Sequence, residues 1–322
     1  MACVQLLDIP IATGDADVPS SQPEHGPAYQ TVDLYVPEGA GKETPLLVFI
    51  HGGAWRSNKP SGYADLGVTF SQNHSVGVAI VGYRLSTRIK DTATAPIKHP
   101  AHTHDVGAAV AWLMASILFD GHATATGNET KDKAASVLNS WNPERVFVMG
   151  HSCGAHTGSL LFMDSEYIHA PLKLFLKDTP HQNIQPTAWV PRIKGYIGAE
   201  GIYDIPLLVK TFPTYKDWFI VDAFGEEETG AWALGSPTRL TPVLHSMPPA
   251  DHLIVQSVGD ELVDVAQAKC WLDTLSDIKK NGGSALDKWT LDYNVDRLSS
   301  NHDDVLKDAA FFELVSKWIH AH

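Results

Sequence analysis

Short, continuous apolar runs recur along the chain and are separated by segments of helical periodicity. The clearest run is Leu46–Ile50, and others lie at residues 76–81, 146–149, 193–197 and 253–258. Such runs are typical of strands that are buried on both faces of a sheet. Because strands that alternate with helices form mostly parallel sheets, the pattern predicts an α/β fold with helices on both faces. Ligands of such folds bind beyond the carboxyl ends of the strands.

Weaker patterns mark the two ends of this unit. Residues 30–36 alternate apolar and polar positions, which predicts a half-buried edge strand, and residues 311–319 have the pattern of an amphipathic helix. The stretch before residue 30 is rich in Gly, Pro, Ser and Asp. We therefore expect an irregular N-terminal segment over residues 1–29 and a single α/β domain over residues 30–322.

Two segments inside this domain fit neither pattern. Residues 163–191 contain several Pro, His and Lys, and residues 206–250 contain two tryptophans and a Pro-Pro pair. We expect both to be insertions that cover the upper edge of the sheet. Either they form a cap over the site, or they are ordinary surface packing.

Charge and cysteine content narrow the classes of partner. The formal net charge is −13, whereas proteins that bind nucleic acids or anionic membranes usually carry a basic excess. The three cysteines do not form a disulfide framework, and we find no signal-like segment and no apolar span suited to a membrane helix. We expect a cytoplasmic protein that acts on a small molecule. The sequence leaves the oligomeric state open, a homodimer included.

A candidate nucleophile lies in the segment Gly150-His151-Ser152-Cys153-Gly154, which matches the pattern G-x-S-x-G. It follows an apolar strand and precedes a helical stretch, which is the strand–turn–helix context that this motif requires. The glycines allow the two backbones to pass closely in a tight turn. The helix start places N–H groups near the serine, where they favour developing negative charge. The context predicts that Ser152 is a catalytic nucleophile.

A second motif directly follows the buried run at residues 46–50. It consists of His51, Gly52, Gly53, Ala54 and Trp55. Acyl transfer builds negative charge on a carbonyl oxygen, and N–H donors must be in place to receive it. We expect the N–H groups of Gly53, Ala54 and Cys153 to form this oxyanion hole. Trp55 is expected either to wall the pocket or to fill the core beneath it.

The acid and the base are expected in two late loops. In folds whose nucleophile lies in a strand–turn–helix G-x-S-x-G motif, the chain order is Ser, then acid, then His. Asp260 follows the run at residues 253–258 and a glycine, and Glu261 and Asp264 compete with it. His302 lies between a late alternating strand and the C-terminal helix. In this interpretation Ser152 attacks, His302 transfers the proton and Asp260 orients the imidazole. No motif predicts a metal site or a cofactor.

These motifs resemble those of the kynurenine formamidase (arylformamidase) family of α/β-hydrolases, and the fungal form is the most similar. The matching parts are HGGxW at residues 51–55, GHSxGA at 150–155, the Gly259–Leu262 turn and the Asn301-His302 loop. The resemblance runs from about residue 30 to 319. It implies hydrolysis of N-formyl-L-kynurenine to formate and L-kynurenine, in tryptophan catabolism and NAD biosynthesis. It also implies a triad of Ser152, Asp260 and His302.

Two other functions remain open at this point. A general carboxylesterase for small acyl esters uses the same HGG loop and the same tight turn at the nucleophilic serine, here called the elbow (residues 150–154). It differs in the shape of its pocket. A non-catalytic binding protein on the same fold commonly lacks one triad member, whereas all three candidates are present in this sequence.

Overall fold

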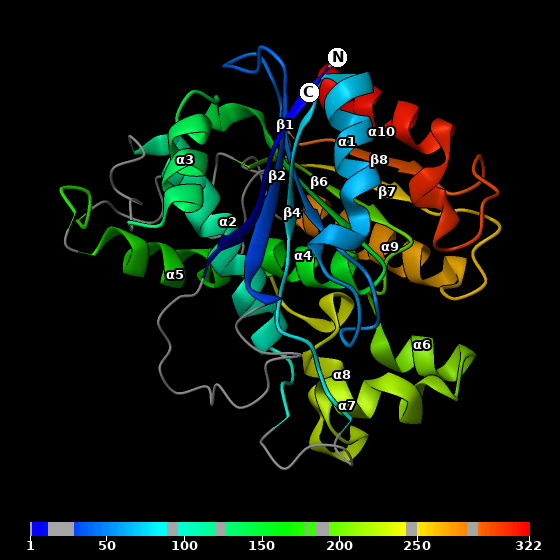
Figure 1. Cartoon of the computed structure of the whole chain (residues 1–322). Coiled ribbons are helices and arrows are strands. Elements are labelled where there is room, and N and C mark those ends of the chain that lie inside the picture. Colours follow the sequence, from blue (N-terminus) through cyan, green and yellow to red (C-terminus); the bar gives the residue numbers. More distant parts are fainter. Residues whose placement is uncertain are drawn as a thin grey trace.

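The computed structural model describes residues 2–11, 29–88, 96–119, 127–177, 179–183, 193–242, 250–281 and 289–322. These residues form one eight-stranded sheet in the order β1-β2-β4-β3-β5-β6-β7-β8 (Figure 1). The strands are β1 (Cys3–Pro10), β2 (Thr31–Pro37), β3 (Leu46–Ile50), β4 (Gly77–Val81), β5 (Val146–His151), β6 (Ile193–Ala199), β7 (Asp251–Val255) and β8 (Leu291–Asn294). Strand β2 runs antiparallel to both of its neighbours, and the other pairs are parallel.

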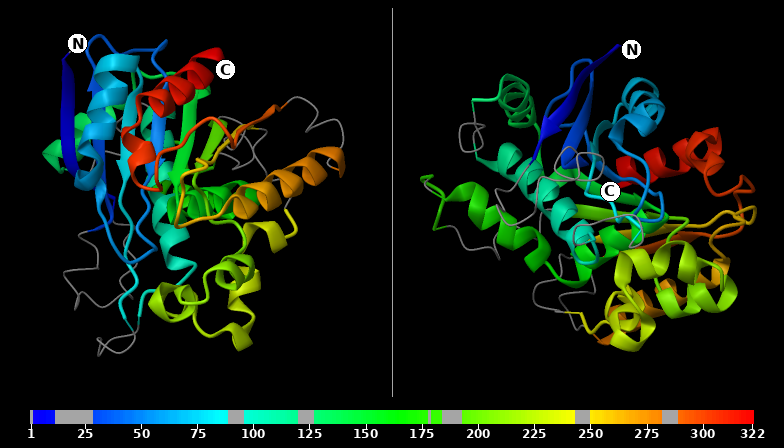
Figure 2. Two further views of the ribbon diagram at one scale, coloured as in Figure 1. Left: turned by 90° about the vertical axis from the view of Figure 1, so that its right-hand side faces the viewer. Right: turned by 60° about the horizontal axis from the view of Figure 1, so that its bottom comes forward.

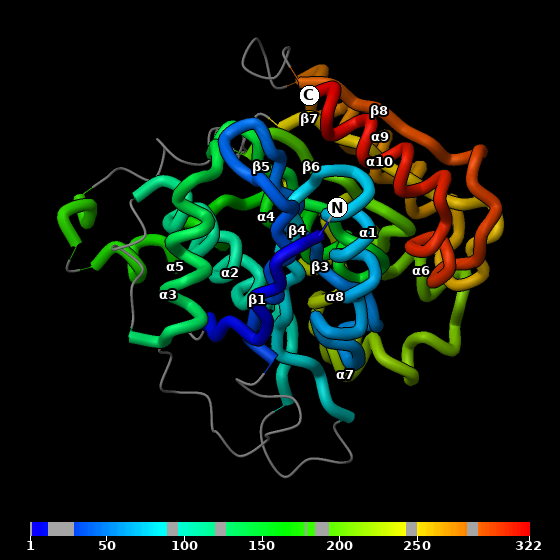
Figure 3. Tube along the Cα trace, turned by 45° about the horizontal axis from the view of Figure 1, so that its top comes forward, coloured from blue at the N-terminus to red at the C-terminus, as the bar shows by residue number. Residues whose placement is uncertain are grey.

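Helices cover both faces of the sheet, as Figure 3 shows from above. One face packs against α1 (Ala64–His74) and α10 (Ala309–Ala321). The other packs against α2 (Ala101–Leu118), α3 (Glu129–Leu138), α4 (Cys153–Met163), α5 (Glu166–Leu176) and α9 (Val265–Asn281). The central strands β3 and β4 are fully buried, which explains their unbroken apolar sequence. The predicted α/β fold is confirmed.

The structure corrects the prediction for the N-terminal segment. Residues 3–10 form β1, which pairs with β2, so β2 is not the edge strand and is almost wholly buried. The register shifts between Leu6 and Ile9, where Asp8 has φ +54° and donates its N–H to Asp33. This bulge separates the two buried side chains by three residues and hides the alternation that marks a strand. Residues 12–28 lie outside the described part.

The two expected insertions differ from each other. Helix α5, from the first, packs against α2 on the face of the sheet, and its residues do not line the pocket at Ser152. The second forms a small cap at one end of the sheet (Figure 2). Its elements are α6 (Ile205–Thr211), a π-helix (Lys216–Ile220), α7 (Val221–Phe224) and α8 (Ala231–Leu234). Residues 178, 184–192 and 243–249 lie outside the described ranges.

The cap has an apolar core of its own. The core consists of Trp55, Ile205, Leu208, Phe219, Ile220, Phe224 and Trp232, among others. The same cluster includes Trp55, which follows β3, and Cys153, which begins α4, so it packs the cap against the ends of the strands. Within the described part of the chain, none of the helices combines the length and apolar character that a membrane span requires.

Candidate active site

Ser152 lies at the sharp turn between β5 and α4. Its backbone has φ +57° and ψ −124°, a strained conformation for a residue with a side chain. Its N–H donates to Ala199 O at 3.0 Å, which fixes the turn against β6. A Cβ on Gly154 would lie 2.2 Å from Ile50 O, so only glycine permits the helix to start this close to β3. The turn leaves the Ser152 side chain at the wall of a pocket.

His302 and Asp260 meet beside this turn. The Nδ1 atom of His302 lies 2.9 Å from Asp260 Oδ2, and the two side chains are 4% and 1% exposed. A proton on Nδ1 that donates to the carboxylate leaves Nε2 free to accept a proton. Burial by itself would raise the pKa of Asp260, but hydrogen bonds from His302 and Glu200 lower it well below its ordinary value. Asp260 is therefore ionised at neutral pH.

The other two candidate acids have different partners. Asp260 Oδ1 also accepts the N–H groups of Leu262 and Val263, both at 2.9 Å, so the loop after β7 wraps its carboxylate. Glu261 accepts the backbone N–H of His302 at 3.2 Å and does not reach its ring. Asp264 Oδ1 is buried and has no hydrogen-bond partner among the described residues. The structure thus brings Asp260 to the His302 ring, as predicted.

Asp260 nevertheless lies farther from its strand than the sequence indicates. The apolar run extends to residue 258, but β7 ends at Val255, and Val258 is largely exposed. The strand ends where Gln256 and Ser257 turn their polar groups toward Glu200.

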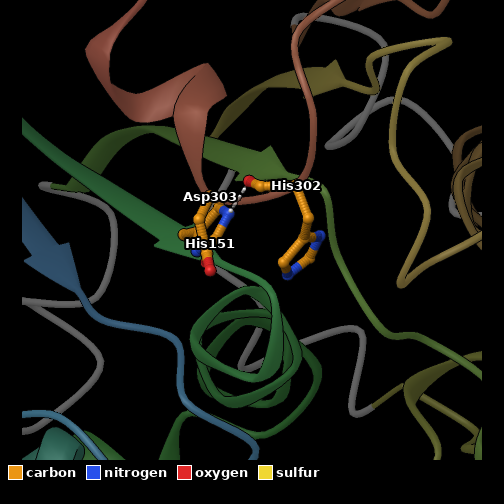
Figure 4. A group of neighbouring side chains, drawn as sticks. All are labelled: His151, His302 and Asp303. Carbon is orange, nitrogen blue, oxygen red and sulfur yellow. Dashed lines mark hydrogen bonds between the residues drawn. The ribbon is translucent and has the colours of Figure 1, made fainter.

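A residue of the elbow, His151, forms a hydrogen bond with the backbone of His302. His151 Nε2 donates to the carbonyl of His302 at 3.0 Å, the dashed bond in Figure 4. Burial, and after it the nearby His302, lowers the pKa of His151 to about 3, so its ring is neutral. His151, the first variable position of G-x-S-x-G, therefore holds the loop that carries His302, a contact that the sequence did not indicate.

The predicted oxyanion loop passes beside Ser152. Gly53 O accepts the N–H groups of Arg56 and Ser57, both at 3.0 Å, in a tight turn. Gly53 has φ +116°, and a Cβ there would lie 2.4 Å from Ser57 O, so glycine is required. Gly53 and Ala54 line the same pocket as Ser152. The oxyanion role of the loop stays a prediction, which this placement supports.

Trp55 and the side chain of Cys153 lie beneath the loop. Trp55 is buried and meets His156 and Phe224 edge-on, at 5.0 and 4.9 Å between ring centroids. It does not line the pocket, so it fills the core below the cap. The backbone N–H of Trp55 donates to Cys153 Sγ at 3.2 Å. Burial raises the pKa of that thiol to about 11. The sulfur is therefore a neutral packing group. His51 is likewise buried, against Tyr83.

The pocket at Ser152 has a volume of about 410 Å³. One wall holds Ser152, His302 and the Gly53–Ala54 loop. The cap supplies the apolar lining residues Tyr215, Trp218 and Phe219, and the loops after β6 and β7 supply Ile202, Leu262 and Val263. Arg56 and Asp303 add opposite charges to the lining. The sequence offered a faint signal for these residues, since Arg56 directly follows the HGGxW segment and residues 212–224 are rich in aromatics.

Two groups of side chains of the types that bind metals occur among the described residues. They are His151, His302 and Asp303 in Figure 4, and Glu200, Asp260 and His302. Both include His302, and the second is held together by hydrogen bonds.

The order of the strands in the sheet, the elbow at Ser152 and the positions of the loops that carry Gly53, Asp260 and His302 define the class of protein. The chain has the α/β-hydrolase fold. Esterase B from Lactobacillus rhamnosis superposes with a TM-score of 0.64 at 12% identity, over 99% of this chain and 87% of that one. The family model BD-FAE matches residues 32–117.

The predicted resemblance to kynurenine formamidases is also confirmed. The kynurenine formamidase of Meyerozyma guilliermondii is 29% identical over 242 residues, which cover 71% of this chain and 70% of that protein. A kynurenine formamidase-like hydrolase of Fusarium equiseti is 28% identical over 269 residues, 74% of each chain.

Proposed function

We propose that this chain is a serine hydrolase that cleaves N-formyl-L-kynurenine to formate and L-kynurenine. The observation that carries the proposal is one pocket lined by Ser152, His302 and the Gly53–Ala54 loop, with Asp260 hydrogen-bonded to the His302 ring behind it. Similarity to kynurenine formamidases supports the choice of substrate.

In the proposed reaction, Ser152 Oγ attacks the formyl carbonyl while His302 Nε2 takes the hydroxyl proton. The N–H groups of Gly53, Ala54 and Cys153 face the resulting oxyanion. His302 then passes the proton to the aniline nitrogen, which leaves as L-kynurenine. Water attacks the formyl ester with His302 again as the base, and formate departs. The nitrogen shares its lone pair with an aromatic ring, so this amide is easier to cleave than an alkyl amide.

The remaining pocket residues suit the leaving group. L-Kynurenine combines an aromatic ring with an amino-acid zwitterion. Tyr215 and Trp218 offer ring surfaces, Arg56 offers a donor pair for the carboxylate, and Asp303 offers an acceptor for the ammonium group. We propose these roles as the basis of substrate selection.

A general carboxylesterase is the second candidate, because the apolar side chains of Ile202, Leu262 and Val263 in the lining would also accept an acyl chain. The two functions predict opposite trends with acyl size. A formamidase needs no room beyond the formyl hydrogen, whereas an esterase gains about 0.8 kcal/mol for each buried methylene.

Turnover of two substrate series separates these candidates. We expect kcat/KM to fall steeply from N-formyl- to N-acetylkynurenine, and to fall along nitrophenyl esters from acetate to hexanoate. A rising ester series without turnover of N-formylkynurenine would leave the esterase function standing instead.

A further inference from the structure

A second buried acid lies behind the His302–Asp260 pair. Glu200 follows the last residue of β6, and its side chain has no exposure to solvent. Its Oε1 accepts the N–H of Ser257 at 2.8 Å, and its Oε2 lies 2.8 Å from Gln256 Nε2. Among the ion pairs of the described residues, none involves Glu200. Burial without a cationic partner disfavours a charge on this carboxyl group.

The two acids are too close to be ionised together. Ligand atoms of Glu200, Asp260 and His302 all lie within 4.8 Å of one another. The same Gln256 Nε2 lies within 2.9 Å of an oxygen of each acid. Two buried carboxylates at such a distance share one proton between them.

The hydrogen bonds decide which acid keeps the proton. Asp260 accepts two backbone N–H groups, the Gln256 amide and the His302 ring. Among the described residues, Glu200 accepts from Ser257 and the shared amide. Asp260 therefore carries the negative charge. Burial, and after it the hydrogen bond and charge of Asp260, raises the pKa of Glu200 well above its ordinary value.

We propose that Glu200 is a positioning residue, which stays protonated and donates its carboxyl proton to Asp260. This inference rests on the proposed triad and adds a fourth member to it. The donated proton stabilises the ionised carboxylate of Asp260 and holds Oδ2 toward His302 Nδ1. Because Glu200 is neutral, His302 faces the charge of one acid rather than two.

The backbone at Glu200 fits a functional constraint. The residue has φ +50°, a left-handed conformation that glycine adopts more readily than glutamate. Its N–H donates to Val255 O at 2.9 Å, which holds the residue between β6 and β7. Strain of this kind persists where the surroundings over-determine the conformation, often at functional sites.

Titratable groups approach Glu200 from three elements. Asp260 and Glu261 lie on the loop after β7, His302 lies on the loop before α10, and Tyr203 lies on the loop before α6. Burial raises the pKa of Tyr203, so it stays neutral, and the acids are the groups that matter at neutral pH.

Substitution of Glu200 tests the inference through the pH profile of kcat/KM, which reports ionisation of the free enzyme. Glu200→Gln keeps a neutral hydrogen-bond donor next to Asp260. We therefore expect the acidic limb of the kcat/KM profile to stay at the same pH. Glu200→Leu removes the donor, so kcat should fall about 10- to 100-fold. Its acidic limb should move to higher pH, because Asp260 becomes more basic and favours protonated His302. Asp264→Asn, the same acid-to-amide change outside the network, is the control.

Two results would overturn the inference. If Glu200→Gln moves the acidic limb of the kcat/KM profile to lower pH by about one pH unit or more, Glu200 is charged in the native enzyme. A Glu200→Leu enzyme that matches the wild type in kcat and in pH profile would mean that Glu200 does not position Asp260. Circular dichroism tests whether each variant folds. If the leucine variant does not fold, the pH profile of the glutamine variant still decides whether Glu200 is neutral.

Infrared spectroscopy tests the protonation independently of turnover. In the Ser152→Ala background at neutral pH, we expect a protonated-carboxyl C=O band that Glu200→Gln removes and Asp264→Asn retains. Absence of that band would overturn the inference. A wild-type enzyme that retains the band but hydrolyses neither amides nor esters would instead defeat the proposed function.

Discussion

The two walls of the pocket are built in different ways. The wall that holds Ser152, His302 and the Gly53–Ala54 loop is here called the reacting wall. His302 on this wall, and Asp260 behind it, lie in loops at strand ends and are enclosed by hydrogen bonds on both side chain and backbone. On the cap wall, Tyr215, Trp218 and Phe219 come from one continuous segment and contact each other mainly as rings, at 5.1 to 5.4 Å. Hydrogen bonds fix an atom in position, whereas ring packing tolerates exchange of side chains.

Two side-chain hydrogen bonds of the described residues join the two walls. Arg56 Nη1 donates to the carbonyl of Trp218, and Tyr215 Oη donates to Leu262 O at 3.1 Å. Trp218 is 47% exposed although it lines the pocket. Under the proposed function, catalytic geometry and substrate choice therefore lie on separable parts of the molecule. Changes on the reacting wall should lower kcat, and changes on the cap wall should raise KM.

The largest expected effect is that of Ser152→Ala. Loss of a triad nucleophile lowers kcat by about 10⁴–10⁶. Because the cap wall is untouched, binding of L-kynurenine, followed by fluorescence, should match the wild type. Labelling by a fluorophosphonate should also disappear. Residual activity above a few per cent in the purified variant would exclude Ser152 as the nucleophile.

Asp260→Asn should have the next largest effect. The asparagine favours the wrong imidazole tautomer, which lowers kcat by roughly 10³–10⁴. Steady-state kinetics of Asp264→Asn supply the comparison, since the buried Oδ1 of that residue has no hydrogen-bond partner among the described residues. If Asp264→Asn were the more damaging change, the assignment of Asp260 as the acid would be wrong.

Arg56→Gln tests substrate binding where the two walls meet, since Arg56 donates to the Trp218 carbonyl of the cap. Loss of a charged hydrogen bond to the substrate carboxylate should raise KM for N-formylkynurenine about 10- to 100-fold. Nitrophenyl acetate has no carboxylate, so its turnover should change little. The matched control is Arg88→Gln, since Arg88 is exposed and does not line the pocket. An equal loss with both substrates would mean that Arg56 does not bind the substrate carboxylate.

The smallest effect concerns pH and the attachment of the cap. His156, on α4, donates from Nε2 to Gly235 O of the cap at 2.6 Å. Burial lowers the pKa of His156 to about 3. The unfolded chain binds this proton below about pH 6.5, so stability is complete above that pH and declines as the pH falls toward 3.

Urea unfolding at two pH values measures this effect. At pH 5.5, His156 should cost about 1 kcal/mol of unfolding free energy relative to pH 7.5. His156→Gln, which stays neutral, should reduce the pH dependence by that amount, whereas the exposed His320→Gln should not. An unchanged pH dependence in His156→Gln would show that folding does not lower the pKa of this histidine.

Local steric requirements explain what the sequence predicts well. The elbow at Ser152 and the turn at Gly53 need glycine at particular spacings, and each follows a strand whose burial makes its sequence continuously apolar. The chain order of the motifs then predicts the loops of Asp260 and His302. Strand β1 escaped prediction because its bulge breaks the alternation on which such predictions rest.

The sequence by itself therefore determined the class of fold, the candidate nucleophile and the candidate oxyanion loop, because each depends on neighbours along the chain. Tertiary structure alone decided that Trp55 fills the core, that residues 205–234 cap the pocket and that α5 does not. It also decided the role of Glu200, which looks in the sequence like any acid in a turn. Its burial beside Asp260 arises only when the ends of β6 and β7 pack together, since electrostatic coupling depends on distance in space.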